Sequence, residues 1–313
     1  MTTATQNPPH ILPPLNRRRF LAAAATMVAG KALAGPAPAE PLLDIHQHTN
    51  YSGRSDQELV AHQALHEVTT TVLLPGAGWM LSEVGDTVSC ANLQADFPNM
   101  FARFACADVA ESSTEDVLRG NVHRGAIGFG ELKFHVAVDS PEMHRVYKLA
   151  GELQVPVLVH FQHEEYNTGL ERFESVLKAY PKVTFVGHAQ TWWGNISADL
   201  DPTVMYPTGR VKPGGLTDRL LSDYANVYGD LSANSGLNAL TRDPDFAQDF
   251  LERHHAKLLW GSDCACRDGK GATRGACIAT QSLATLRKLV TDRAKLRHIL
   301  YENGAALYRL PKV

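Results

Sequence analysis

Charged residues are scarce and almost balanced in this 313-residue chain. They make up 20% of the sequence, and 30 basic against 33 acidic side chains leave a formal net charge of -3. A protein with no positive excess lacks the broad basic surface that contacts nucleic-acid phosphates, so we expect no nucleic-acid partner. Hydrophobic residues, at 44%, are as frequent as in ordinary globular proteins, which excludes a disordered or collagen-like chain.

Cysteines are few and long apolar runs are missing. An odd count of five cysteines excludes a disulfide scaffold, because at least one thiol stays free even in an oxidising compartment. No Gly-x-Gly-x-x-Gly motif follows a predicted strand, which argues against a nucleotide-binding doubly wound sheet. The apolar run at 20–30 is too short, at about 1.5 Å per residue, to cross a hydrocarbon core roughly 30 Å thick. We therefore expect no stable membrane anchor.

The N-terminus carries the pattern of an export signal. Arg17, Arg18 and Arg19 precede the apolar run, and the small-residue triplet at 32–34 offers a cleavage site. Paired arginines followed by x-Phe-Leu resemble the twin-arginine signal of bacterial proteins that fold before they cross the membrane. We predict that the twin-arginine export machinery recognises residues 1–34 and that the mature domain, 35–313, is periplasmic or secreted.

The rest of the chain repeats one pattern. Short apolar, β-branched runs alternate with amphipathic segments of about 10 to 15 residues, as in β/α units with a parallel sheet. The predicted strands are 42–48, 70–74, 100–107, 127–134, 156–161, 183–188, 227–231 and 258–262. Eight such units suit a single α/β domain of roughly 250 residues, the (β/α)8 or TIM barrel.

The first predicted strand carries polar side chains at every second position. Asp44, His46 and His48 alternate along it, so we expect all three to point into the barrel while Leu43 and Ile45 face outward. Two imidazoles at this spacing can bind one metal ion.

Three later strands end on further metal-binding side chains. His160 ends the fifth strand, His188 ends the sixth, and Asp263 follows the eighth. Active sites of these barrels gather at the carboxyl ends of the strands, and nitrogen and carboxylate ligands suit a divalent cation. One such histidine is more often a hydrogen-bonded core residue, but the ordered set predicts a metal site.

This set of residues, with the segment at 299–306, resembles the amidohydrolase superfamily. Within it, the chain is similar to the amidohydrolase-related group that includes aminocarboxymuconate-semialdehyde decarboxylase. The resemblance covers residues 44–310 and implies a TIM-barrel metal enzyme. It implies metal ligands at the following positions: His46, His48, His160 and Asp263. The resemblance gives His188 a catalytic role, with metal ligation as the alternative.

The fourth strand leaves the number of ions open. Family members with two ions bridge them with a carboxylated lysine or a glutamate on this strand, and either Glu131 or Lys133 could do so here. Alternatively, both belong to a polar network inside the barrel. We expect one divalent ion, zinc, with manganese or iron as alternatives and a second ion not excluded.

The expected chemistry is metal-assisted hydrolysis of a small-molecule amide, ester or lactone. A divalent metal lowers the pKa of its water from 15.7 toward about 7. Asp263 would accept the proton of that water and return it to the leaving group, while His188 would polarise a carbonyl. The alternatives are a non-oxidative decarboxylase or hydratase on the same scaffold, and a metal-binding barrel without activity.

Loops after the strands should bind the substrate. We expect the long segment at 189–214 to form a lid with an aromatic wall, and two loop arginines to hold a carboxylate. The candidate substrate-binding residues are Arg54, His163, Tyr166, Trp192, Trp193 and Arg267. Solvated loop positions are the alternative for the arginines, and a surface excursion is the alternative for the lid.

Other metal-binding residue types are given ordinary roles. His62 and His66 lie four apart on a helix predicted outside the barrel, where a solvated face is favoured over a metal site. Cys264 and Cys266 are expected to be loop cysteines rather than a thiolate pair or a strained disulfide. The family resemblance makes a homo-oligomer plausible.

Overall fold

The computed structural model describes residues 40–271 and 276–311 of the chain. The predicted export signal, residues 1–34, lies outside the described residues. The described part belongs to one structural unit that starts at Glu40. Within it, no helix combines the length and the apolar character that a membrane span requires.

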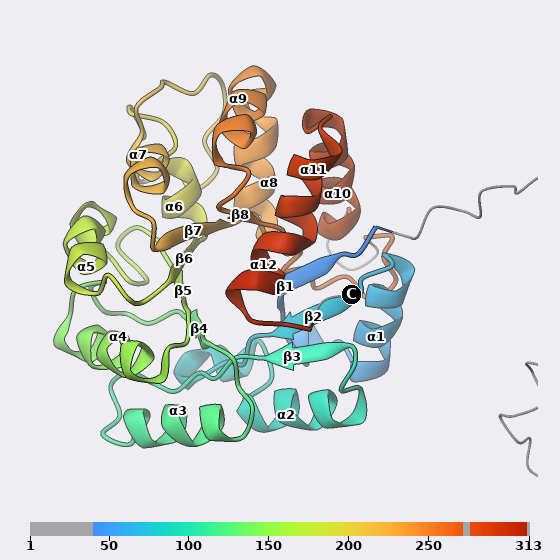
Figure 1. Ribbon diagram of the computed structural model, residues 1–313, viewed down its shortest axis with the longest axis vertical. Coiled ribbons are helices and arrows are strands. Elements are labelled where there is room, and N and C mark those ends of the chain that lie inside the picture. The colour runs from blue at the N-terminus through green and yellow to red at the C-terminus, as the bar shows by residue number, and fades with distance from the viewer. Residues whose placement is uncertain (1–39, 272–275, 312–313) are drawn as a thin grey trace, which may run out of the picture. The chain divides into compact units, whose positions relative to one another are not determined.

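Eight parallel strands form a closed barrel, as predicted (Figure 1). They are β1 (Leu43–Gln47), β2 (Thr70–Leu73), β3 (Phe101–Arg103), β4 (Phe129–Leu132), β5 (Val157–His160), β6 (Phe185–His188), β7 (Val227–Asp230) and β8 (Leu258–Leu259). They make a sheet of β1 to β3 and a sheet of β4 to β8. A bridge between Ala105 and Phe129 joins the sheets on one side, and Ile45 donates to the carbonyl of Trp260 at 3.3 Å on the other.

Helices surround the strands (Figure 1). They are α1 (Asp56–Leu65), α2 (Thr87–Asp96), α3 (Thr114–His123), α4 (Pro141–Leu153), α5 (Phe173–Ala179), α6 (Gln190–Gly194), α7 (Leu216–Asp223), α8 (Ala233–Thr241), α9 (Pro244–His254), α10 (Ile278–Leu289), α11 (Arg293–Arg297) and α12 (Asn303–Leu307). α1 begins at a capping box, in which the Ser55 side chain accepts from the Glu58 amide while the Glu58 carboxylate accepts from the Ser55 amide. This reciprocal pair satisfies two amides that a helix start leaves unbonded.

The barrel interior away from the carboxyl ends of the strands is filled with apolar side chains. Leu43 and Ile45 pack there in one cluster with Leu158 and other residues of β2, β3, β6 and β8. The helix α12 covers this cluster at Gly304, where a Cβ would lie 2.6 Å from Leu43 Cδ2. The close approach therefore requires glycine.

This packing corrects the predicted orientation of β1. Ile45 faces the interior, whereas Asp44 faces α1 and accepts a hydrogen bond from Gln63 at 2.9 Å. The pairing register of β1 with β2 shifts between Asp44 and Gln47. Such a bulge inserts an extra residue and breaks the strict alternation of side chains. Because of it, His46 lies on the same side as Ile45.

The segment after β6 also differs from its prediction. It starts with α6, whose two indoles are buried, with Trp192 0% and Trp193 2% exposed. Trp192 packs against Gly187, where a Cβ would lie 2.4 Å from the indole, and Trp193 packs against Gly229. The predicted aromatic wall is therefore wrong for these two residues, because both belong to the core between the barrel and its helices.

Candidate metal centre and active site

The two histidines of the first strand and the aspartate after the eighth meet at the strand ends. The Nε2 atoms of His46 and His48 are 3.2 Å apart. Asp263 Oδ1 lies 3.8 Å from the first and 3.6 Å from the second. These three atoms are close enough to ligate one ion.

Glu131 on β4 completes this group and connects it to the other two histidines. Its Oε2 lies 3.7 Å from the Nε2 atoms of both His46 and His48. Its Oε1 lies 2.5 Å from His160 Nδ1 and 3.6 Å from His188 Nε2. One carboxylate thus faces both pairs of imidazoles.

Lys133, the other fourth-strand candidate, lies at the wall of the site. Its ammonium sits 5.0 Å from the ring centre of Trp79 and 5.1 Å from that of Tyr166. Such cation–π contacts hold the side chain against the two rings. Of the two candidates for a bridging ligand, the geometry therefore favours Glu131.

Asp230 and Ser232 belong to the site and were not predicted. Asp230 Oδ2 lies 2.7 Å from His46 Nδ1 and 3.1 Å from His188 Nδ1, and it accepts from Ser232 Oγ at 2.9 Å. His48 Nδ1 donates to the carbonyl of Leu74 at 2.7 Å. A proton fixed on Nδ1 in this way leaves the Nε2 lone pair for a metal, an arrangement common in metal sites.

Burial and neighbouring charges set the protonation of the cluster. Burial by itself would raise the pKa of Glu131, but the imidazole of His160 outweighs it and lowers that pKa well below the ordinary value. Burial likewise opposes ionisation of Asp230, and His188 and His46 outweigh it to lower its pKa. Burial lowers the pKa of His48 to about 4. Ionised carboxylates therefore lie beside a neutral imidazole at neutral pH.

The charge balance and one unpartnered atom both fit a bound cation. Within the described part of the chain, every ion pair of Glu131, Asp230 and Asp263 is with a histidine. Asp263 Oδ1 is buried without a hydrogen-bond partner. A buried carboxylate oxygen is costly unless something pairs with it. A divalent ion between this oxygen and the two Nε2 atoms would satisfy all three.

A cavity of about 210 Å³ opens onto this cluster. Its lining includes Tyr51, Lys133, His160, His188, Tyr206, Asn234 and Asp263. The backbone of Asp263 has a φ of 45°, and its amide donates to the carbonyl of His46 at 2.9 Å. The loop after β8 is thus tied to β1 at the residue that carries the candidate acid–base carboxylate.

Comparison with known proteins fits this geometry. The family model described as Amidohydrolase matches residues 44–310. The chain belongs to the amidohydrolase family. Curated proteins include no significant match to it.

Solved structures similar to this amidohydrolase include enzymes of several activities. A probable 2-pyrone-4,6-dicarboxylic acid hydrolase from Acinetobacter baumannii is 16% identical, with 86% of this chain and 99% of that chain covered and a TM-score of 0.59. A 2,6-dihydroxybenzoate decarboxylase from Rhizobium is 12% identical, covering 87% and 99%, with a TM-score of 0.56. A dihydroorotase from Campylobacter jejuni is 17% identical, covering 87% and 84%, with a TM-score of 0.55. At these identities the likeness shows the shared fold.

Arg54 of this amidohydrolase braces the site instead of facing the cavity. Its side chain is buried and donates to the carbonyls of Cys264 at 2.6 Å and His48 at 3.1 Å, and to Gln47 Oε1. The predicted role as a clamp for a substrate carboxylate is therefore wrong, because these acceptors already occupy the guanidinium. It links the metal-binding strand to the loop after β8.

The remaining substrate candidates are not among the residues that line the cavity. Arg267 donates to the carbonyl of Gly53 at 3.2 Å and is partly exposed. Tyr166 stacks on Trp79 with ring centres 4.9 Å apart. His163 lines a separate groove of about 250 Å³ with Gln162 and Met205. Contact of Arg267, Tyr166 and His163 with a substrate stays a prediction.

Proposed function

We propose that this amidohydrolase is a metal-dependent hydrolase that uses an activated water on an amide, ester or lactone bond of a small molecule. The observation that carries the proposal is the convergence of His46 Nε2, His48 Nε2 and the unpartnered Asp263 Oδ1 beside the cavity. Membership of the amidohydrolase family supports it.

One zinc ion is the proposed cofactor. His46 and His48 would supply two nitrogens, Asp263 one oxygen and Glu131 a second one, a set of ligands that zinc accepts and that manganese or iron would also accept. His160 and His188 form a further candidate group around Glu131, where a second ion could bind. When bound, a divalent ion supplies Lewis-acid activation of water and of the substrate carbonyl.

Asp263 and His188 would move and hold the protons. The other oxygen of the Asp263 carboxylate, Oδ2, would take a proton from the attacking water and return it to the leaving nitrogen or oxygen, so no net proton is consumed at the carboxylate. His188 Nδ1 lies 3.1 Å from Asp230 Oδ2, which orients the imidazole ring. Its Nε2 would donate a hydrogen bond to the carbonyl oxygen, on which negative charge develops.

A decarboxylase is the second candidate. The similarity to 2,6-dihydroxybenzoate decarboxylase supports it, and Lys133 at the cavity wall offers a positive charge for a substrate carboxylate. In that reaction His188 would pass a proton to the ring carbon, the carbon–carboxyl bond would break and carbon dioxide would leave, and a proton from solvent would replace the one that His188 gave up.

Labelled water separates the two reactions. The zinc-loaded protein is incubated in ¹⁸O-water with lactones, anilides and hydroxybenzoates, and the products are analysed by mass spectrometry. Label in a ring-opened or cleaved product supports hydrolysis. Carbon dioxide release without label would overturn the hydrolase proposal in favour of the decarboxylase. A chelated, metal-free preparation that kept full activity would contradict both.

Location and assembly remain predictions from the sequence. Recognition by the twin-arginine machinery, a periplasmic or secreted mature form and a homo-oligomer rest on residues 1–34 and on family resemblance alone.

A further inference from the structure

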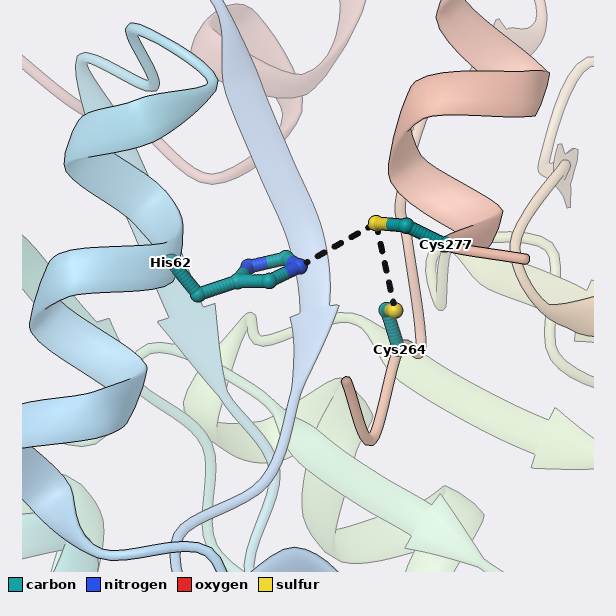
Figure 2. A group of neighbouring side chains, drawn as sticks. All are labelled: His62, Cys264 and Cys277. Atoms are coloured by element: carbon teal, nitrogen blue, oxygen red, sulfur yellow. Dashed lines mark hydrogen bonds between the residues drawn. The ribbon is translucent and has the colours of Figure 1, made fainter. Parts of the chain in front are cut away.

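A second group of metal-binding side chains lies apart from the barrel centre. We call it the Cys–His cluster. His62, Cys264 and Cys277 place their ligand atoms within 4.8 Å of one another, and His66 joins them through a 3.4 Å contact with the sulfur of Cys277. The two histidines belong to the end of α1, Cys264 lies on the loop after β8, and Cys277 caps the start of α10. Figure 2 shows the ring of His62 reaching from α1 toward the two sulfur atoms.

The histidines are not on the solvated face that the sequence predicts. His62 is 1% exposed, as buried as the two cysteines, and His66 is partly buried. Their rings are 4.7 Å apart and both Nε2 atoms point toward Cys277. Helical spacing of four therefore brings two imidazoles to the same sulfur.

Three distances, each involving the sulfur of Cys277, match the edges of a tetrahedral zinc site. Zinc binds sulfur at about 2.3 Å and nitrogen at about 2.1 Å, so a tetrahedron has edges of about 3.8 Å between sulfurs and about 3.6 Å between sulfur and nitrogen. The two Sγ atoms are 3.8 Å apart. Cys277 Sγ lies 3.5 Å from His62 Nε2 and 3.4 Å from His66 Nε2.

The tautomer of His62 also suits a metal ligand. The side-chain nitrogen of Gln63 donates hydrogen bonds to Asp44 at 2.9 Å and to Thr71 at 2.8 Å. These bonds turn Gln63 Oε1 toward His62 Nδ1, at 3.1 Å. An acceptor at Nδ1 places the proton there and leaves the lone pair on Nε2. That lone pair points at the sulfurs.

Both cysteines of the cluster are buried free thiols, so their sulfurs are available to a metal. Thiolate is the form that binds metal, and each coordinated cysteine gives up its proton.

We propose that the Cys–His cluster binds one zinc ion, separate from the ion of the barrel centre. Zinc binding releases the protons of both thiols and forms two zinc–sulfur and two zinc–nitrogen bonds. The ion joins α1, α10 and the loop after β8. Because Cys264 directly follows Asp263, and its carbonyl accepts from Arg54, the site fixes the loop that carries the acid–base carboxylate.

Cobalt substitution tests this site independently of activity. Cobalt bound to thiolate gives a sulfur-to-metal charge-transfer band in the near ultraviolet, and the barrel centre has no sulfur ligand. We expect the band in the cobalt-loaded protein, purified with a phosphine reductant, and we expect Cys277→Ser to lose the band and one equivalent of metal. Cys90→Ser is the control, because this buried thiol contacts Thr49 and lies outside the cluster.

His66→Ala provides a second variant that should fold, since the side chain is only partly buried. We expect it to weaken zinc binding at the cluster by at least about tenfold in a competition titration with a chelator. Absence of the band in the cobalt-loaded wild type would overturn the proposal. So would a disulfide between Cys264 and Cys277 in the purified protein, detected as two fewer free thiols after denaturation.

Discussion

Asp230 contacts two imidazoles for which we propose different tasks. Its Oδ2 lies 2.7 Å from Nδ1 of His46 and 3.1 Å from Nδ1 of His188. His46 also lies against His48 and Asp263, the candidate metal ligands, whereas His188 borders the cavity. The same carboxylate thus orients one imidazole for the metal and one for the substrate.

Replacing each histidine should separate these tasks. We expect His46→Ala to lose the central metal and the activity together. His188→Ala should keep most of the metal while its turnover falls by roughly 10²- to 10⁴-fold, the usual loss for a proton-transfer group. Elemental analysis of metal per chain, alongside turnover on the same samples, measures both. Equal loss of metal in the two variants would contradict this division.

The predicted ligands and the missed Asp230 differ in what a sequence can reveal. His46, His48, His160, His188 and Asp263 stand at strand ends, and side-chain chemistry alone marks them as metal-binding types. Asp230 also ends a strand, but its role is a hydrogen bond to the far nitrogen of two rings. That role depends on ring orientations that only the folded barrel defines. The spacing of Asp230 and Ser232 at the end of the seventh predicted strand was the available signal.

At the scale of helices, one ionic cluster joins α7 to α9. Asp218 accepts from His254 at 2.6 Å and from Arg253 at 2.5 and 3.1 Å. Burial would raise the pKa of Asp218, but these hydrogen bonds lower it below the ordinary 3.8. A carboxyl with a lowered folded-state pKa stabilises the protein above its unfolded-state pKa, and this stabilisation is lost as the pH falls through the folded-state value.

Asp218→Asn should therefore destabilise the protein in a pH-dependent way. We expect a loss of about 1 kcal/mol at pH 7, because solvent partly screens the cluster. The difference in unfolding free energy between the variant and wild type should shrink as the pH falls below about 3.8, because Asp218 is then protonated first in the unfolded state and, at lower pH, in the folded state. Denaturant midpoints measured from pH 7 down to pH 3 test this. Asp223→Asn, at the exposed last residue of α7, is the control and should cost under about 0.5 kcal/mol. A constant difference across the pH range would contradict the assignment.

The elements show where sequence patterns succeed and where they fail. All eight strands were predicted, because each is a short apolar run that is buried on both faces. Their ends were predicted too long, since burial continues past the hydrogen-bonded ladder, as in β8, which ends at Leu259. The two tryptophans of α6 were expected to line the substrate site. They instead pack in the core, where Gly187 and Gly229 leave room for them.

The bulge in β1 is the clearest case of information that the sequence does not carry. Alternation predicts Asp44 and His46 on one face, yet the register shift puts Ile45 and His46 on the same side. Asp44 instead accepts hydrogen bonds from Gln63 of α1 and from Ser262, partners that lie far from it in the sequence.

At the scale of the whole molecule, the candidate metal centre spans the two sheets of the barrel. His46 lies in β1 of the three-stranded sheet and His48 directly follows that strand, whereas Glu131 lies in β4 of the five-stranded sheet. Asp263 follows β8 at the other junction. An ion bound there would therefore link the two sheets, in addition to the backbone contacts that close the barrel.

Removing the central metal should lower the thermal stability. We expect chelation to lower the midpoint temperature of unfolding and added zinc to restore it. Free zinc at 100 times its Kd should raise the free energy of unfolding by about 2.7 kcal/mol. The Cys277→Ser protein is the background of choice, because it isolates the barrel centre from the Cys–His cluster. Differential scanning calorimetry with and without zinc measures the change. An unchanged midpoint would show that no ion links the sheets.

The apolar cluster under α12 has a consequence for substrate entry and product release. Leu43, Ile45 and their neighbours close the interior beneath the histidines, so in the described part of the chain molecules approach the ion from the strand-end side. Substrate and product must then enter and leave through the same opening. A slowly departing product would compete directly with fresh substrate, and turnover would be governed by departure as much as by bond cleavage.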